Sequence, residues 1–131
     1  MARKQIKLEY IFRASPAIIY TFVTTPECLV RWYCDDVDIT GEVYTFIWSN
    51  HGEIAYMIDD IEEERVRYKW KNASENEYLE FRIFKADITN ETIMEIIDFC
   101  DEDEVQETTD LWNTLMAVSY THLTLPTSDL V

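Results

Sequence analysis

Residues 14–32 read ASPAIIYTFVTTPECLVRW, and this stretch decides the fold. Ser15 precedes Pro16 and Thr25 precedes Pro26, so a residue suited to an N-cap is twice followed by proline. Proline fits the first position of a helix, because the backbone N–H that it lacks has no helical acceptor there. Hydrophobic residues then recur at helical spacing after each proline. We therefore expect two short helices joined by a bend.

On both sides of this stretch, hydrophobic and polar residues alternate with the period of a half-buried β-strand. One such segment precedes the two helices, and the others follow Asp36 with short connections that favour antiparallel neighbours. A turn is expected at Asn50, His51 and Gly52, and a bend at Gly41. The expected strands cover residues 6–12, 37–40, 43–48, 54–61, 65–70, 79–83 and 92–99.

A final helix is expected over residues 104–117. Acidic residues at 101–104 stand where the positive end of the helix dipole favours carboxylates. Leu111 and Trp112 belong to a set of hydrophobic residues at helical spacing that we expect to face the sheet. The helix would be about 21 Å long, which is enough to cross a sheet. The predicted fold class is α+β: a seven-stranded curved antiparallel sheet with two short helices after the first strand and a C-terminal helix packed across it.

The end of the chain has an unusual sequence. Residues 118–127 read VSYTHLTLPT, which resembles the translation of a transposon-based sequencing adapter. A segment of foreign origin carries no information about the native fold, so residues 118–127 are left out of the fold prediction. We expect a domain at residues 1–117 with a truncated final helix, followed by a non-native tail at 118–131; a natural polar tail is the alternative.

The composition indicates one folded, strongly acidic domain. The chain has 131 residues, 47% of them hydrophobic, and a net charge of −15 from 11 basic and 26 acidic side chains. A field of this sign repels nucleic acid and anionic membrane surfaces, so neither is an expected partner. A basic protein partner stays open, and the sequence leaves the oligomeric state undecided.

Several features indicate a cytoplasmic protein without a metal or other cofactor. We expect no signal peptide, because residues 1–10 are alternating and polar and contain no apolar run. We expect no membrane insertion, because no run approaches the roughly eighteen hydrophobic residues of a membrane span. Cys28, Cys34 and Cys100 are scattered, as in proteins of a reducing compartment. His51 is the one histidine outside the tail, so no zinc site and no catalytic triad is expected. A calcium-loop-like start at Asp36 lacks the glutamate that its twelfth position needs.

Large aromatic residues and one acidic residue are the candidates for ligand binding. Such rings either line a pocket or fill the core, and we favour the core. Tyr68 and Trp70 share one face of their strand. Asp98 has the parity to point inward, as a structural group or as a polar anchor for a ligand, and we favour the structural role. The candidates are Trp32, Phe46, Trp48, Tyr56, Tyr68, Trp70, Phe81, Asp98 and Trp112.

The segments KLEYIFRASPAIIYTFVTTPECLVRWYCDDV, YTFIWS, YLEFRIFK, MEIIDF and EVQETTDLWN together resemble the START-like, or SRPBCC, superfamily with its helix-grip fold. Within the superfamily it more closely resembles small acidic bacterial START-like proteins related to the domain that activates the heat-shock chaperone ATPase. The resemblance covers residues 4–117. It implies an apolar cavity between the sheet and the final helix, and it implies no catalytic residue.

Two classes of function follow, with a third behind them. The first is a non-enzymatic binding module for a small hydrophobic ligand, lipid-like or polyketide-like. The alternative is a co-chaperone-like protein-interaction domain, and the third is an enzyme of the cyclase or dehydratase type. A cavity with one or two polar groups favours the first class, whereas a filled core with an exposed apolar patch favours a protein partner.

Overall fold

The computed structural model describes residues 2–86 and 91–129, with side chains up to residue 117. Seven strands form one antiparallel sheet in the order β1-β7-β6-β5-β4-β3-β2. The strands are β1 (Arg3–Phe12), β2 (Asp36–Thr40), β3 (Val43–Trp48), β4 (His51–Ile61), β5 (Arg65–Trp70), β6 (Leu79–Lys85) and β7 (Thr92–Asp101). The helices are α1 (Pro16–Thr24), α2 (Pro26–Trp32), the 3-10 turn η1 (Glu102–Glu104) and α3 (Val105–Asp129).

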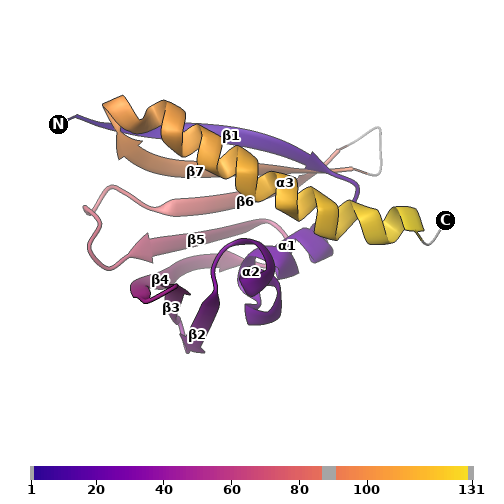
Figure 1. The fold of residues 1–131 in the computed structure, drawn as a ribbon, viewed down its shortest axis with the longest axis horizontal. Coiled ribbons are helices and arrows are strands. Elements are labelled where there is room, and N and C mark those ends of the chain that lie inside the picture. Colours follow the sequence, from indigo (N-terminus) through magenta and orange to yellow (C-terminus); the bar gives the residue numbers. More distant parts are fainter. Residues whose placement is uncertain (1, 87–90, 130–131) are drawn as a thin grey trace.

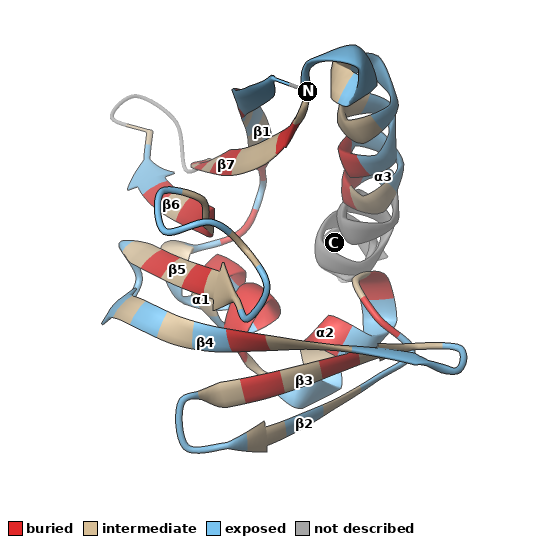
Figure 2. Ribbon diagram, turned by 90° about the vertical axis from the view of Figure 1, so that its left-hand side faces the viewer, coloured by how far each residue is buried: buried red, intermediate tan, exposed pale blue. Residues whose placement is uncertain are grey.

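The helices cover one face of a strongly curved sheet. The first strand pairs with the last, so β1 lies at one edge and β2 at the other. Figure 1 shows α3 crossing in front of β7 and β6, with α1 and α2 nearer the β2 edge. In Figure 2 the sheet curves around the side on which α2 and α3 lie. The predicted α+β architecture, a curved sheet gripping a C-terminal helix, is confirmed.

The two proline-started helices form as predicted, with one difference at their junction. The Ser15 hydroxyl accepts a hydrogen bond from the Ile18 amide at 3.3 Å, so it caps α1. Thr25 occupies the N-cap position of α2, but its side chain does not cap that helix. Its hydroxyl instead donates to the Thr21 carbonyl at 2.8 Å, because the same residue also ends α1.

The predicted bend at Gly41 is present, but the next turn differs from the prediction. Gly41 adopts a left-handed φ of 61° between β2 and β3. Trp48 pairs with His51, so the turn between β3 and β4 consists of Ser49 and Asn50 rather than residues 50–52. Ser49 takes a φ of 53°, and its amide donates to the Asp35 carboxylate at 2.5 Å. The Asp35 side chain thus holds a positive φ without a glycine.

The face of α3 that meets the sheet is narrower than predicted. Trp112 and Met116 are 3% and 1% exposed, and Val105 and Leu115 pack partly against the core. Leu111 is 57% exposed, so the expectation that it faces the sheet is wrong. At about 100° per residue, Val105 and Met116 lie within about 40° of Trp112 around the helix, whereas Leu111 lies about 100° away and so points toward solvent.

The helical backbone of α3 continues through the adapter-like segment to Asp129. The side chains from residue 118 onward lie outside the described residues, so the predicted foreign origin of residues 118–127 stays a prediction. Within the described part of the chain, no helix combines the length and hydrophobicity needed to cross a membrane.

Candidate functional site

Five of the predicted rings pack together between the sheet, α2 and α3. They are 1–5% exposed: Trp32, Phe46, Tyr68, Phe81 and Trp112. The Trp32 and Trp112 ring centroids are 6.4 Å apart, and Phe81 lies 6.2 and 6.0 Å from them. Phe46 and Tyr68 meet edge to face at 5.8 Å. Such distances are typical of packed aromatic side chains, so these rings fill the core.

Three polar atoms of the aromatic core donate hydrogen bonds to backbone carbonyls of α1 and of Tyr33, the residue that follows α2. Trp32 Nε1 donates to the Phe22 carbonyl at 2.9 Å. The Tyr68 hydroxyl donates to the Val23 carbonyl at 2.8 Å. Trp48, which is half-buried, donates from Nε1 to the Tyr33 carbonyl at 2.6 Å. The Trp32 bond therefore joins α2 to α1, and the Tyr68 and Trp48 bonds join this pair of helices to the sheet.

Tyr33 is an aromatic residue of this cluster that sequence reasoning missed. Its ring stacks on Trp112 with centroids 6.1 Å apart and planes 15° apart, and it meets Trp48 edge to face at 5.4 Å. Burial raises the pKa of its hydroxyl, as does the negative charge of Asp98. Tyr33 lies just after the end of α2 and before β2. Neither the helical nor the strand periodicity extends to this position, so no local pattern points to Tyr33.

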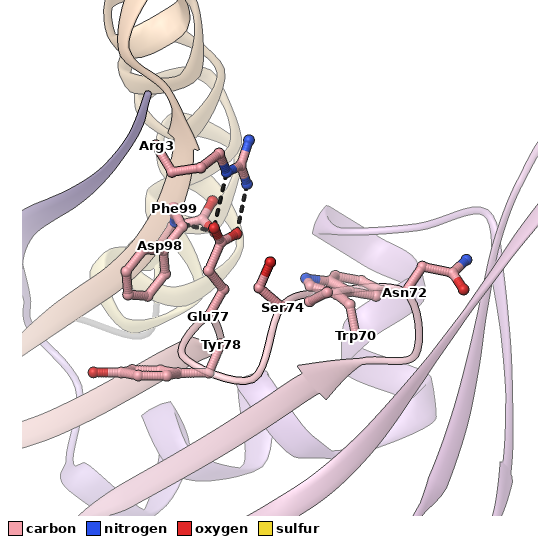
Figure 3. Close-up of a pocket in the computed structure, with 9 residues that line it drawn as sticks. Arg3, Trp70, Asn72, Ser74, Glu77, Tyr78, Asp98 and Phe99 are labelled. Carbon is pink, nitrogen blue, oxygen red and sulfur yellow. Dashed lines mark hydrogen bonds and ion pairs between the residues drawn. The ribbon is translucent and has the colours of Figure 1, made fainter. Parts of the chain in front are cut away.

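A pocket of about 340 Å³ opens beside this core, where the β5–β6 loop faces the end of β7 (Figure 3). Trp70 and Asp98 are the two predicted residues that line it. The Trp70 ring is half-buried and contacts Phe46 at a centroid distance of 5.6 Å, so the pocket adjoins the aromatic core. The lining residues are Arg3, Trp70, Asn72, Ala73, Ser74, Glu77, Tyr78, Asp98 and Phe99.

Asp98 places a carboxylate at the junction of the pocket and the core. Its Oδ2 accepts a hydrogen bond from Trp112 Nε1 at 2.9 Å, and its Oδ1 accepts one from the Phe99 amide at 2.8 Å. Burial raises the pKa of this carboxyl, although both hydrogen bonds and the charge of Arg3 favour the ionised form. The inward orientation expected from strand parity is therefore present.

Arg3 holds one rim of the pocket. Its Nε and Nη2 bond to the two carboxylate oxygens of Glu77 at 2.9 and 2.6 Å, and its Nη1 bonds to Asp101 at 2.9 Å. The guanidinium lowers the pKa values of both Glu77 and Asp101. These bonds join β1 to the β5–β6 loop and to the end of β7. The guanidinium of Arg3, the basic group that lines the pocket, is thus already paired with two carboxylates of the protein.

The prediction that Tyr56 lines the cavity is wrong. Tyr56 pairs across the strands with Lys69, so it faces the side of the sheet opposite to Tyr68 and Trp70. Its side chain is 37% exposed, whereas its neighbour Ala55 is fully buried. The inward positions of β4 belong to Ala55 and Met57, because strand parity and not residue size decides the face.

A larger hollow of about 540 Å³ lies between α1 and β4, but two of the carboxylates that line it are already bonded within the protein. Asp60 accepts a hydrogen bond from the Tyr20 hydroxyl at 2.6 Å. Asp59 accepts one from Arg65 Nε at 2.6 Å. None of the predicted ligand-binding residues lines this hollow, so the pocket beside Trp70 is the candidate site.

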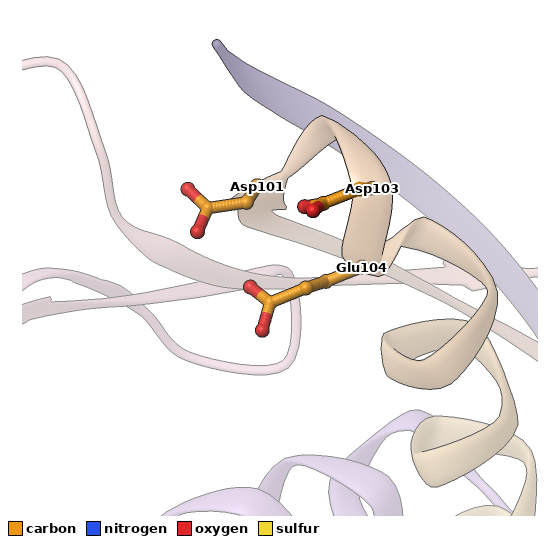
Figure 4. A group of neighbouring side chains, drawn as sticks. All are labelled: Asp101, Asp103 and Glu104. Atoms are coloured by element: carbon orange, nitrogen blue, oxygen red, sulfur yellow. The ribbon is translucent and has the colours of Figure 1, made fainter. Parts of the chain in front are cut away.

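Three acidic side chains at the end of β7 and in η1, just before α3, lie close enough together to hold a metal ion (Figure 4). The possible ligand atoms of Asp101, Asp103 and Glu104 are within 4.8 Å of one another. Asp101 is already bound to Arg3, and the group stands at a helix N-terminus that favours acidic residues in any case. The arrangement is explained without a metal, and the predicted absence of a metal stays a prediction.

The fold agrees with the comparison with protein families. The model of the START-like superfamily domain matches residues 1–124, and the chain belongs to this superfamily. The comparison with curated proteins finds no match.

Solved structures share this fold over nearly the whole chain. A Bacteroides fragilis protein is 26% identical with a TM-score of 0.68, and the match covers 95% of this chain and 93% of that one. The Aha1 dimer from Colwellia psychrerythraea is 18% identical with a TM-score of 0.77, covering 92% and 96%. DynU16, from the dynemicin biosynthetic locus, is 12% identical with a TM-score of 0.77, covering 92% of this chain and 47% of that one.

Proposed function

We propose that this protein is a non-enzymatic binding module for a small hydrophobic ligand, held in the pocket beside Trp70 and Asp98. The observation that carries the proposal is the pocket itself: about 340 Å³ next to an aromatic core, with an inward carboxylate at the junction. Small-molecule sites typically have volumes of about 300–1,000 Å³, and this pocket lies near the lower end of that range. Because Phe46 and Trp112 fill the deeper space, the ligand is small and binds at the open end.

The fold is compatible with this proposal. One structural neighbour, DynU16, comes from the dynemicin biosynthetic locus, and at 12% identity the likeness is one of fold. Cys28, Cys34 and Cys100 are free thiols, which suits the reducing cytoplasm that we propose as the location.

The proposal is tested by titrating the protein with a naphthalene-based hydrophobic dye and following dye fluorescence. We expect saturable binding that weakens about tenfold in Trp70→Ala, because a flat ring loses its stacking surface. Tyr56→Ala is the matched control, since it removes a ring from the opposite face of the sheet. Native mass spectrometry of protein purified from cells would in addition show a co-purifying small molecule. Absence of dye binding, or equal loss in both variants, would count against a ligand site here.

A second candidate, a protein-interaction domain, is favoured by hydrophobic residues on the outer face of the sheet. Ile11, Ile93 and Phe84 pair across three adjacent strands, and Ile11 and Phe84 are 49% and 47% exposed. A basic partner would suit the net charge of −15. Native mass spectrometry distinguishes the two functions: a co-purifying protein lost in Phe84→Ser but kept in Trp70→Ala would support this candidate.

A further inference from the structure

We infer that the ligand carries a protonated amine that binds Asp98, with a flat hydrophobic body lying against Trp70. This inference rests on the proposed function and names the chemistry of its ligand. Figure 3 shows Asp98 and Trp70 on opposite sides of the pocket, so one molecule can reach both.

Asp98 has bonding capacity left after its contacts within the protein. A carboxylate offers about four acceptor positions. Trp112 and the Phe99 amide each fill one of them. Neither donor is charged, and the nearby Arg3 is bonded to Glu77 and Asp101 instead. A partly buried carboxylate is stabilised most by a charged donor, which a ligand amine supplies.

The aromatic side chains around the pocket favour a cation for a second reason. The faces of Trp and Tyr rings attract cations at distances within about 6 Å. Tyr78 already shows this, because the Arg67 guanidinium lies over its ring at 4.0 Å. Trp70 supplies an indole ring on the other side of the pocket. A primary amine can therefore bond to Asp98 while its hydrophobic body stacks on the indole.

Charge disfavours a carboxylate or phosphate ligand at the same place. Glu77 and Asp98 both line the pocket, and the chain carries a net charge of −15. Arg3 could pair with an anion only by giving up its fork to Glu77. The field of the whole protein also raises the local concentration of cations and lowers that of anions.

Three probes with one ring system test the inference: naphthylethylamine, naphthylethanol and naphthylacetate. Calorimetric titration of the wild-type protein at neutral pH and low salt gives their dissociation constants. We expect the amine to bind about tenfold more tightly than the alcohol, and the carboxylate to bind most weakly, because charge-assisted hydrogen bonds are about twice as strong as neutral ones.

Asp98→Asn tests whether this residue causes the preference. The variant keeps the side-chain shape, and we expect the advantage of the amine over the alcohol to fall to about twofold or less. Asp38→Asn is the matched control, because it removes the same unit charge from an exposed position on β2. The indole N–H resonance of Trp112 gives a readout in the wild type: the amine should shift it more than the alcohol does.

The outcomes separate the inference from the proposed function. If all three probes bind equally, or naphthylacetate binds most tightly, the amine preference is overturned while ligand binding stands. If the preference persists in Asp98→Asn, or falls equally in Asp38→Asn, Asp98 is not its source. If no probe binds, the proposed function fails, and the inference fails with it. Should Asp98→Asn not fold, the wild-type affinities and the Trp112 resonance decide.

Discussion

Trp112 Nε1 donates a hydrogen bond to Asp98 Oδ2 at 2.9 Å, and this bond joins α3 to β7. The two residues are 14 positions apart, and the short turn η1 connects the strand that carries Asp98 to the helix that carries Trp112. The bond sets the rotation of α3, so that the Trp112 ring packs against Tyr33 and Phe81. One contact therefore connects the aromatic core, the helix and the candidate pocket.

Trp112→Phe should lower the free energy of unfolding by about 2–4 kcal/mol, because it removes buried ring atoms and leaves Asp98 short of a donor. The measurement is urea denaturation at neutral pH. Trp48→Phe is the control, since that ring is half-buried and bonds to a backbone carbonyl. Equal losses in the two variants would show that the Asp98 bond adds little.

Asp98 should make stability depend on pH in a defined direction. Burial raises the pKa of the folded-state carboxyl, so the unfolded chain loses this proton at a lower pH than the folded protein. Stability is therefore lost as pH rises through the interval between the two pKa values, which begins near the ordinary aspartate value of about 3.9. In Asp98→Asn this loss is absent. Melting temperatures of both proteins from about pH 4 to about pH 7 should show the variant gaining on the wild type; a constant difference would contradict the prediction.

The Arg3–Glu77 ion pair should give stability a pH dependence opposite to that of Asp98. Replacing Arg3 in Arg3→Gln should lower the stability only slightly. Arg3 lowers the pKa of Glu77, so the pair stabilises the fold above the ordinary carboxyl pKa and loses that contribution as pH falls. The Arg3 side chain is 46% exposed, and an exposed pair contributes about 1 kcal/mol or less. Carboxyl carbon resonances should show the pKa of Glu77 rising in the variant. An unchanged titration would mean that the ion pair is not formed in solution.

Glu80 is fully buried on the outer face of the sheet, between Arg67 and Arg82. Glu80→Ala should lower the free energy of unfolding by about 2–3 kcal/mol, because two partly buried guanidinium groups lose their shared acceptor. Glu42→Gln removes an acidic charge from an exposed turn and should change stability by about 0.5 kcal/mol or less. Chemical denaturation of both variants makes the comparison, and a neutral Glu80→Ala would show that the arginines find other acceptors.

The two caps of the helical pair should differ in strength. Ser15→Ala should cost about 1 kcal/mol, because its hydroxyl caps α1. Thr25→Ala should cost less, since the Thr25 hydroxyl bonds back to the Thr21 carbonyl and leaves α2 uncapped. Thermal melts of the two variants provide the measurement. A larger loss in Thr25→Ala would mean that its hydroxyl caps α2 in solution.

Local patterns predicted the elements well but the site only in part. Ser15 and Pro16 mark the start of α1, and the alternation through Tyr68 and Trp70 marks an inner face, because both signals depend on nearby residues alone. The prediction that Tyr56 lines the cavity was wrong, because it followed from the aromatic side chain and not from the alternation of residues between the two faces of β4. Tyr33 was missed because it lies where no period extends.

The sequence by itself determined the order of strands and helices, the acidic charge and the inward parity of Asp98, since helix and strand periods are set within a few residues. Only the tertiary structure decided which of these groups meet. Arg3 and Glu77 are 74 positions apart, and they form one rim of the pocket because β1 pairs with β7 at the edge of the sheet. Such contacts depend on how distant strands pair and on how α3 is rotated, and no local period encodes either.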